Sequence, residues 1–292
     1  MHSEQKGIIL TLSYILIAGT ANILIASYLK IYNQFAITLI CFTASVLYFL
    51  IINIQSLNKI YMICKTHYKD FIKLNIYTSI NWLSFYFALS ILEPITSITI
   101  VHVVGTTLDN KRLISKNKYI YLYVVAVFLL FIHELMQNQM ISSSCQIFLA
   151  LFLSYVSGYS IFKITLLSKK FNDRGLVAGQ VMLIRFFILI ILCLILVSLI
   201  KENSIYLKPV DILYIICIGF LSIILPVYLL QTAYSLSKTN NILLTLSFAP
   251  VLIFFLQFFD RNIKFSSLVA MSIAIVSMVS MRMTFYKISK IR

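Results

Sequence analysis

The sequence contains few charged residues. Asp, Glu, Lys and Arg together make up 11% of its 292 residues, whereas hydrophobic residues make up 61%. Soluble domains carry about 25% charged residues and are roughly half apolar. This composition excludes an ordinary soluble protein, and we expect an integral membrane protein.

Acidic residues are the scarcest charged type, and none falls in the middle of an apolar run. All nine lie in a predicted loop or at a predicted helix end: Glu4, Asp70, Glu93, Asp109, Glu134, Asp173, Glu202, Asp211 and Asp260. Ionisable groups inside the hydrocarbon are costly and usually functional. The absence of a carboxylate within the predicted spans argues against the simplest proton-coupled antiport, in which a buried carboxylate exchanges protons for a cation.

Cysteine and histidine form no recognisable catalytic or metal-binding pattern. The five cysteines are scattered, without C-x-x-C or Cys/His ligand spacing, and we expect small core residues: Cys41, Cys64, Cys145, Cys193 and Cys217. The motifs H-E-x-x-H, D-D-x-x-D and G-x-S-x-G are missing, and the adjacent His133 and Glu134 are expected on different helix faces. We therefore expect no enzyme activity, no cofactor and no metal site.

Long apolar runs are what the sequence does contain. A transmembrane helix needs about 20 mostly apolar residues, and we predict ten spans: 8–29, 34–54, 71–92, 94–109, 119–134, 141–165, 176–200, 210–236, 240–260 and 265–286. The first run is too long for a signal-peptide core, so we expect it to be retained. The longest polar connection, 55–70, has room for only a turn or two. The predicted fold is all-α, in one compact membrane domain.

The basic residues are distributed unevenly about the ten spans. With a cytoplasmic N-terminus, sixteen lie on that side, five lie on the other side and three lie within spans. Basic loops resist translocation, so both termini are predicted to be cytoplasmic in a multi-pass protein of the inner (plasma) membrane. The net charge of +15 therefore needs no nucleic-acid partner.

Ten spans can form two inverted sets of five, with a boundary between residues 134 and 135. Aligning FALSILEP with TAYSLSKT pairs Ala88 with Ala233 and Ser90 with Ser235, and Asp109 and Asp260 follow at corresponding places. Inverted repeats are a common transporter plan in which the substrate lies near the midplane. We predict five-helix repeats at 1–134 and 135–292.

Two longer stretches resemble a known family. NWLSFYFALSILEP, residues 81–94, is similar to the third-helix motif of the drug/metabolite transporter (DMT) superfamily in its EamA branch, and LSFAPVLIFFLQFFDRN, residues 246–262, is similar to its ninth helix. Ala270 and Ser277 stand where the family usually has two glycines. The resemblance covers essentially the full length. It implies ten helices in two inverted repeats and secondary transport, with amino acids as the leading substrate class.

The third span carries the first group of candidate substrate-binding residues. Asn81 and Trp82 share a helix face, and Tyr86 lies one turn beyond Trp82. An amide beside an indole suits a ligand with an apolar body and a polar head. The alternative is a helix-packing amide with an interfacial tryptophan, but both residues lie roughly 15 Å into the span, which disfavours the interface.

Further candidates lie on the fourth, seventh and eighth spans. His102 is either a ligand for an anion or a proton, or a packing residue, and Tyr228 and Gln231 line either a cavity or a hydrogen-bonded seam between helices. Arg185 either binds a substrate carboxylate or phosphate, or extends its head group to the lipid headgroups. Ser154 and Gly158 are expected to serve packing alone.

The sequence thus predicts a secondary transporter that moves small polar or amphipathic metabolites, such as amino acids, by alternating access. Export is the expected direction. The alternative is uptake or exchange of a host metabolite, such as a nucleotide-derived or S-adenosylmethionine-like compound, because the Ile-, Lys- and Asn-rich composition is typical of AT-rich, host-associated bacteria. A non-transporting membrane subunit and a membrane-embedded enzyme rank below these. The expected partners are a small-molecule substrate and the bilayer, with the chain a monomer or a homodimer.

Overall fold

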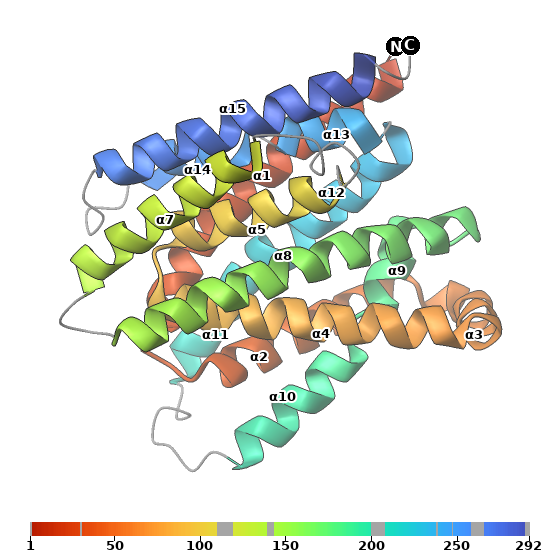
Figure 1. Cartoon of the computed structure of the whole chain (residues 1–292). Helices are drawn as coiled ribbons and strands as arrows, with labels where there is room; N and C mark the ends of the chain where they lie inside the picture. Colours follow the sequence, from red (N-terminus) through yellow and green to blue (C-terminus); the bar gives the residue numbers. More distant parts are fainter. Residues whose placement is uncertain are drawn as a thin grey trace.

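The chain is all-helical wherever its structure is described. The computed structural model describes residues 2–29, 31–109, 119–138, 143–199, 208–237, 239–246, 248–257 and 266–289, and every regular element in these ranges is a helix (Figure 1). The predicted helical class is confirmed.

The helices follow the apolar runs closely. The N-terminal part contains α1 (His2–Leu29), α2 (Gln34–Ile52), the short 3-10 helix η1 (Ile54–Ser56), α3 (Leu57–Thr66), α4 (Tyr68–Ile91), α5 (Pro94–Asp109) and α7 (Tyr119–Asn138). The C-terminal part contains α8 (Ser144–Asp173), α9 (Ala178–Ile184), α10 (Phe187–Leu199), α11 (Pro209–Gly219), the π-helix η3 (Phe220–Ile224), α12 (Leu225–Leu236), α13 (Thr239–Leu246), α14 (Ala249–Gln257) and α15 (Ser267–Ser289).

Five helical segments are long and apolar enough to cross a membrane: Ser3–Leu29, Gln34–Ile52, Ser144–Asp173, Ala178–Leu199 and Pro209–Leu236. Shorter apolar segments occur in α5, α7 and α15. α10 shows the surface that such helices present, because Ile191 and Leu194 are more than half exposed while Leu189 and Cys193 are fully buried. Large exposed aliphatic side chains are suited to lipid rather than to water.

Three local features differ from the sequence-based expectation. The connection 55–70 is mostly helical, because α3 occupies ten residues of it. Cys145 and Cys217 are exposed, so the expectation of core cysteines is wrong for these two. The predicted span 176–200 is interrupted between α9 and α10.

The π-helix η3 lies directly before Pro226. Proline has no N–H and its ring crowds the carbonyl four residues earlier, which here belongs to Ser222 within η3. Widening one turn into a π-helix accommodates such a proline without ending the helix. α11, η3 and α12 therefore form one apolar segment with an irregular turn in its middle.

Helices from the N-terminal part pack mainly on helices from the C-terminal part. α4 and α8 lie alongside each other over much of their length (Figure 1), and α8 also packs on α5. α1 packs on α12 and α14, α2 on α10 and α11, and α7 on α15. The core is therefore shared between the two parts of the chain.

Charged groups join the ends of α4 and α8. Arg174 Nη2 donates to Asp70 Oδ2 at 2.7 Å, and Lys170 Nζ lies 3.8 Å from Asp70 Oδ1. The hydrogen bond from Arg174 holds the pKa of the Asp70 carboxyl below its usual range. This contribution to stability is present above the ordinary pKa of aspartate and is lost as the pH falls through the lowered value.

Gly158 lets α5 and α8 approach closely. A Cβ at this position would lie 2.7 Å from the backbone oxygen of Val101 and 2.8 Å from Val104 Cβ. Backbone cannot move aside as a flexible side chain can, so the contact requires glycine. Small residues permit this kind of approach between membrane helices.

We expect Gly158→Ala to lower the free energy of unfolding by about 1–3 kcal/mol, because the added methyl group overpacks the α5–α8 contact. The measurement is the thermal unfolding midpoint of the purified protein in detergent. Gly105→Ala is the matched control, since a Cβ there meets nothing within 4 Å. Equal midpoints for the two variants would contradict this account of the contact.

Candidate functional site

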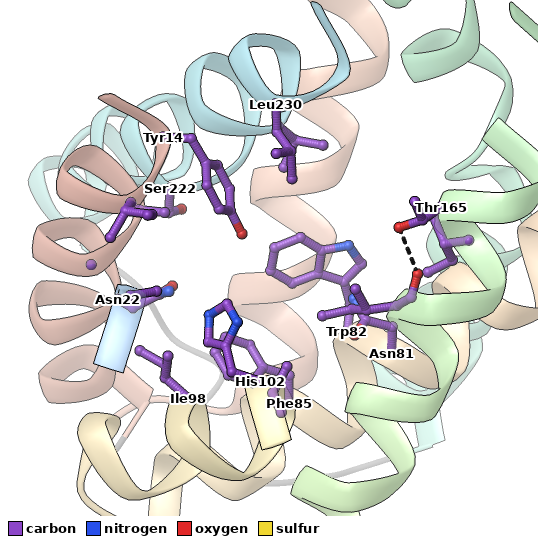
Figure 2. A pocket seen from close by; sticks show the side chains of 18 of the residues that line it. Tyr14, Asn22, Asn81, Trp82, Phe85, Ile98, His102, Thr165, Ser222 and Leu230 are labelled. Atoms are coloured by element: carbon purple, nitrogen blue, oxygen red, sulfur yellow. Dashed lines mark hydrogen bonds between the residues drawn. The ribbon is translucent and has the colours of Figure 1, made fainter. Parts of the chain in front are cut away.

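A cavity of about 120 Å³ lies inside the helix bundle. α1, α4, α5, α8, η3, α12 and α14 contribute side chains to its wall, so both parts of the chain form it (Figure 2). The polar lining residues are Tyr14, Asn22, Asn81, His102, Thr165, Ser168, Arg185, Ser222, Gln231 and Tyr234. Trp82, Phe85 and several aliphatic residues supply the apolar remainder.

The cavity brings together most of the residues predicted from sequence. Those that line it are Asn81, Trp82, His102, Arg185 and Gln231. Tyr86 is not part of the lining and lies behind Trp82, with the ring centroids 5.4 Å apart. Tyr228 is also outside the lining and is 42% exposed. Gln231 and Tyr228 therefore point in different directions from α12.

Trp82 belongs to an aromatic cluster inside the bundle. Its ring meets Phe42 edge-on at 4.9 Å between centroids, and Phe85 at 6.2 Å. Only 7% of its surface is exposed, whereas an interfacial tryptophan lies at the protein surface with its ring among headgroups. The cluster fixes the indole beside the cavity (Figure 2).

Asn81 combines packing with cavity lining. Its Oδ1 accepts a hydrogen bond of 2.8 Å from Ser157 Oγ of α8. The bond links α4 to α8, which is the helix-packing role considered for this amide. Because the residue also lines the cavity, the bond fixes the orientation in which the amide faces the interior.

Arg185 lies at the break between α9 and α10. The amide of Asn75, on α4, takes up the backbone groups on both sides of the break: Nδ2 donates to the Ile184 carbonyl at 2.7 Å, and Oδ1 accepts from the Ile188 N–H at 3.3 Å. In a continuous helix this N–H and this carbonyl would bond each other. The inserted amide replaces that bond, and a side chain inserted in this way is an established cause of helix kinks.

The guanidinium of Arg185 is buried, and no described carboxylate pairs with it. Its side chain is 5% exposed. Nη1 donates a weak hydrogen bond to Met182 Sδ at 3.7 Å, and Cζ lies 5.2 Å from the Phe186 ring centroid. Among the described acidic side chains, none comes within 4.0 Å of it. A head group extended to the lipid surface would instead be exposed. A buried cation normally needs a counter-charge.

Several lining residues carry buried polar atoms with no hydrogen-bond partner within the described part of the chain: Asn22 Oδ1, Trp82 Nε1, Ser168 Oγ, Arg185 Nε and Gln231 Nε2. Such atoms are rare in folded proteins, where most buried polar groups are paired. Those that line the cavity are donors and acceptors available to a polar ligand there.

Tyr14, Asn22 and Ser168 also line the cavity and were not among the residues predicted for it. Asn22 carries the same signal as Asn81, an amide within a long apolar helix. Ser168 lies on the portion of α8 beyond the predicted span 141–165, and its role appears only when α8 is seen to extend to Asp173.

The lining includes no acidic residue and no cysteine. The arrangement can bind a solute through one fixed positive charge, several amide and hydroxyl groups, and an aromatic wall.

Comparison with known proteins informs the fold alone. No protein-family model matches the sequence, and no curated protein matches it. A solved structure described only as "Crystal structure of protein" is similar with a TM-score of 0.64 and 11% sequence identity, over 95% of this chain and 96% of that chain. The architecture therefore has a full-length counterpart among solved structures.

We expect Asn75→Ala to lower the free energy of unfolding by about 1–3 kcal/mol, because it removes the partner of one buried and one partly buried backbone group at the α9–α10 break. Thermal unfolding in detergent measures the effect. Asn58→Ala, at an exposed position on α3, should leave the midpoint unchanged. An Asn75→Ala protein as stable as the control would show that the amide does not hold the break.

Proposed function

We propose that this protein is a secondary transporter of the EamA branch of the DMT superfamily, moving small amphipathic metabolites by alternating access. In this proposal the chain forms ten spans in two inverted five-helix repeats, with both termini in the cytoplasm. The motif resemblance at residues 81–94 and 246–262 and the distribution of basic residues support this topology.

One observation carries the proposal: a buried arginine with no carboxylate partner among the described residues lines a cavity at a break in an apolar helix. Secondary transporters commonly place their substrates at discontinuous helices near the interface of two repeats. The cavity here is lined by residues on both sides of the proposed repeat boundary, including Trp82 and Arg185.

The chemistry of the lining favours a solute with an anionic group and an apolar body. Arg185 presents the donors for a carboxylate, and a guanidinium binds this group in a bidentate manner. Trp82 and Phe85 form an apolar wall. The volume of about 120 Å³ is well below the roughly 300–1,000 Å³ of sites for drug-sized ligands. Small amino acids and related carboxylates fit this description best.

Export is the proposed direction, and uptake or exchange of a host metabolite is the second candidate. Nucleotide-derived compounds and S-adenosylmethionine-like compounds belong to this second candidate, and such bulky solutes require a cavity that enlarges on binding. The small cavity favours small solutes over these bulky ones.

The direct test uses purified protein reconstituted in liposomes. A panel of radiolabelled amino acids and nucleotide-derived metabolites is offered with and without a pH gradient, and empty liposomes are the control. Accumulation or counterflow of a small amino acid supports the proposal. Absence of flux for every compound, with the protein correctly inserted, would contradict transport.

We expect Arg185→Gln to weaken the apparent affinity for a carboxylate substrate roughly 10- to 100-fold, because a charged hydrogen bond contributes about 1.5–3 kcal/mol. Arg185→Lys retains the charge but loses the planar fork, so it should recover part of the affinity. The measurement is the substrate concentration at half-maximal flux.

Two surface variants serve as controls for the cavity. Lys169→Gln removes an exposed positive charge from α8, and Phe152→Ala removes an aromatic ring that is 54% exposed. Both should transport normally, whereas Trp82→Ala should not. Unchanged transport by stably inserted Trp82→Ala and His102→Ala proteins would show that the cavity is not the substrate pathway.

A further inference from the structure

Three metal-ligating side chains meet where α4 connects to α5, and the transport proposal does not use them. Glu93 lies in the connection, and His133 and Glu134 lie near the end of α7. One ligand atom from each of the three lies within 4.8 Å of the others. None of the three lines the internal cavity.

Two contacts hold this cluster together. His133 Nε2 lies 3.2 Å from Glu93 Oε2, and the backbone N–H of Glu93 donates to Glu134 Oε1 at 3.1 Å. The second contact places a carboxylate at the N-terminus of α5, where helix dipoles favour negative charge. His133 and Glu134 are 2% and 0% exposed, and the side chain of Glu93 is 19% exposed.

An ion pair plus a helix cap explains only part of this arrangement. His133 Nε2 is buried and aimed into the cluster, yet it forms no hydrogen bond of acceptable geometry with any described group. Two carboxylates this close to each other repel when both are ionised. A divalent cation between them would bind the imidazole nitrogen and offset the repulsion between the two carboxylates.

We propose that Glu93, His133 and Glu134 bind a divalent zinc-type cation as its three protein ligands. Imidazole and carboxylate ligands suit Zn²⁺, which takes three protein ligands and an exchangeable water in its open sites. Mg²⁺ and Ca²⁺ prefer oxygen ligands alone, so the histidine selects against them. The partial exposure of Glu93 gives the ion a route from solvent.

Bound zinc would join α7 to the start of α5. Glu134 already holds the N-terminus of α5 through its Oε1, and the ion would add a second link through Glu93. Because metal that binds only the folded state stabilises it by mass action, the thermal midpoint of the protein should rise with zinc concentration.

The experiment uses the full-length protein in detergent, stripped of metal with a chelator and dialysed against ZnCl₂. We expect one saturable zinc per chain, measured by elemental analysis, and no displacement by a 100-fold excess of MgCl₂ or CaCl₂. His133→Gln and Glu93→Gln should each weaken zinc binding about 10- to 100-fold, as expected for the loss of a metal ligand or its close support. Both variants retain the backbone N–H that bonds Glu134.

His67→Gln is the matched control, because His67 precedes the start of α4, at the opposite end of that helix from the cluster, and its side chain forms no capping hydrogen bond. It should bind zinc as the unmodified protein does. Failure of the unmodified protein to retain saturable zinc would overturn the proposal, as would equal binding by His133→Gln and His67→Gln. A zinc-dependent rise in the midpoint that disappears only in the cluster variants would support it, whether or not the protein transports a solute.

Discussion

The amide of Asn75 determines the geometry on which the candidate site depends. By bonding the Ile184 carbonyl and the Ile188 N–H, it takes the place of one hydrogen bond of a continuous helix. The interruption sets Arg185 apart from the regular turns of α9 and α10, beside the cavity. Because Asn75 belongs to α4, a residue in the N-terminal part of the chain shapes a helix in the C-terminal part.

Polar side chains also join the N-terminal and C-terminal parts of the chain along α4 and α8. Asn81 accepts from Ser157 in the interior, and Asp70 pairs with Arg174 at the helix ends. In an apolar surrounding there is little hydrophobic gain from helix contact, so close packing and polar bonds of this kind supply the association. These bonds also orient side chains at the cavity, so stability and the binding surface share the same residues.

The sequence predicted the helices well and their interruptions poorly. Apolar runs are local signals, and the ends of α1, α2 and α5 agree with the predicted spans within a few residues. The largest difference is at the start of α1, which begins about six residues before the predicted span. The break at Arg185 depends on an amide more than a hundred positions away, which no local pattern reveals.

The site residues were predicted with mixed success. Trp82 and Asn81 were identified because the rise of a helix per residue gives the depth of each position in the predicted span. Tyr228 was misplaced relative to the lining because three residues turn a helix by about 300°, leaving it roughly 60° from Gln231. His133 and Glu134 were predicted to face apart because the side chains of neighbouring helical residues point in different directions. Glu93, in the connection before α5, lies within reach of both side chains and brings the three together.

The contact at Gly158 leaves little room for α5 and α8 to shift relative to each other. Here α8 meets the backbone of Val101 and the Cβ of Val104 on α5, with no long side chain between the helices to change rotamer and absorb a displacement. Separating the two helices would open a gap, and protein interiors tolerate such gaps poorly. Since α8 is bound to α4 as well, α4, α5 and α8 form one connected group of helices. The cavity lies between this group and α1, α12 and α14, so it does not follow the sequence division near residue 134.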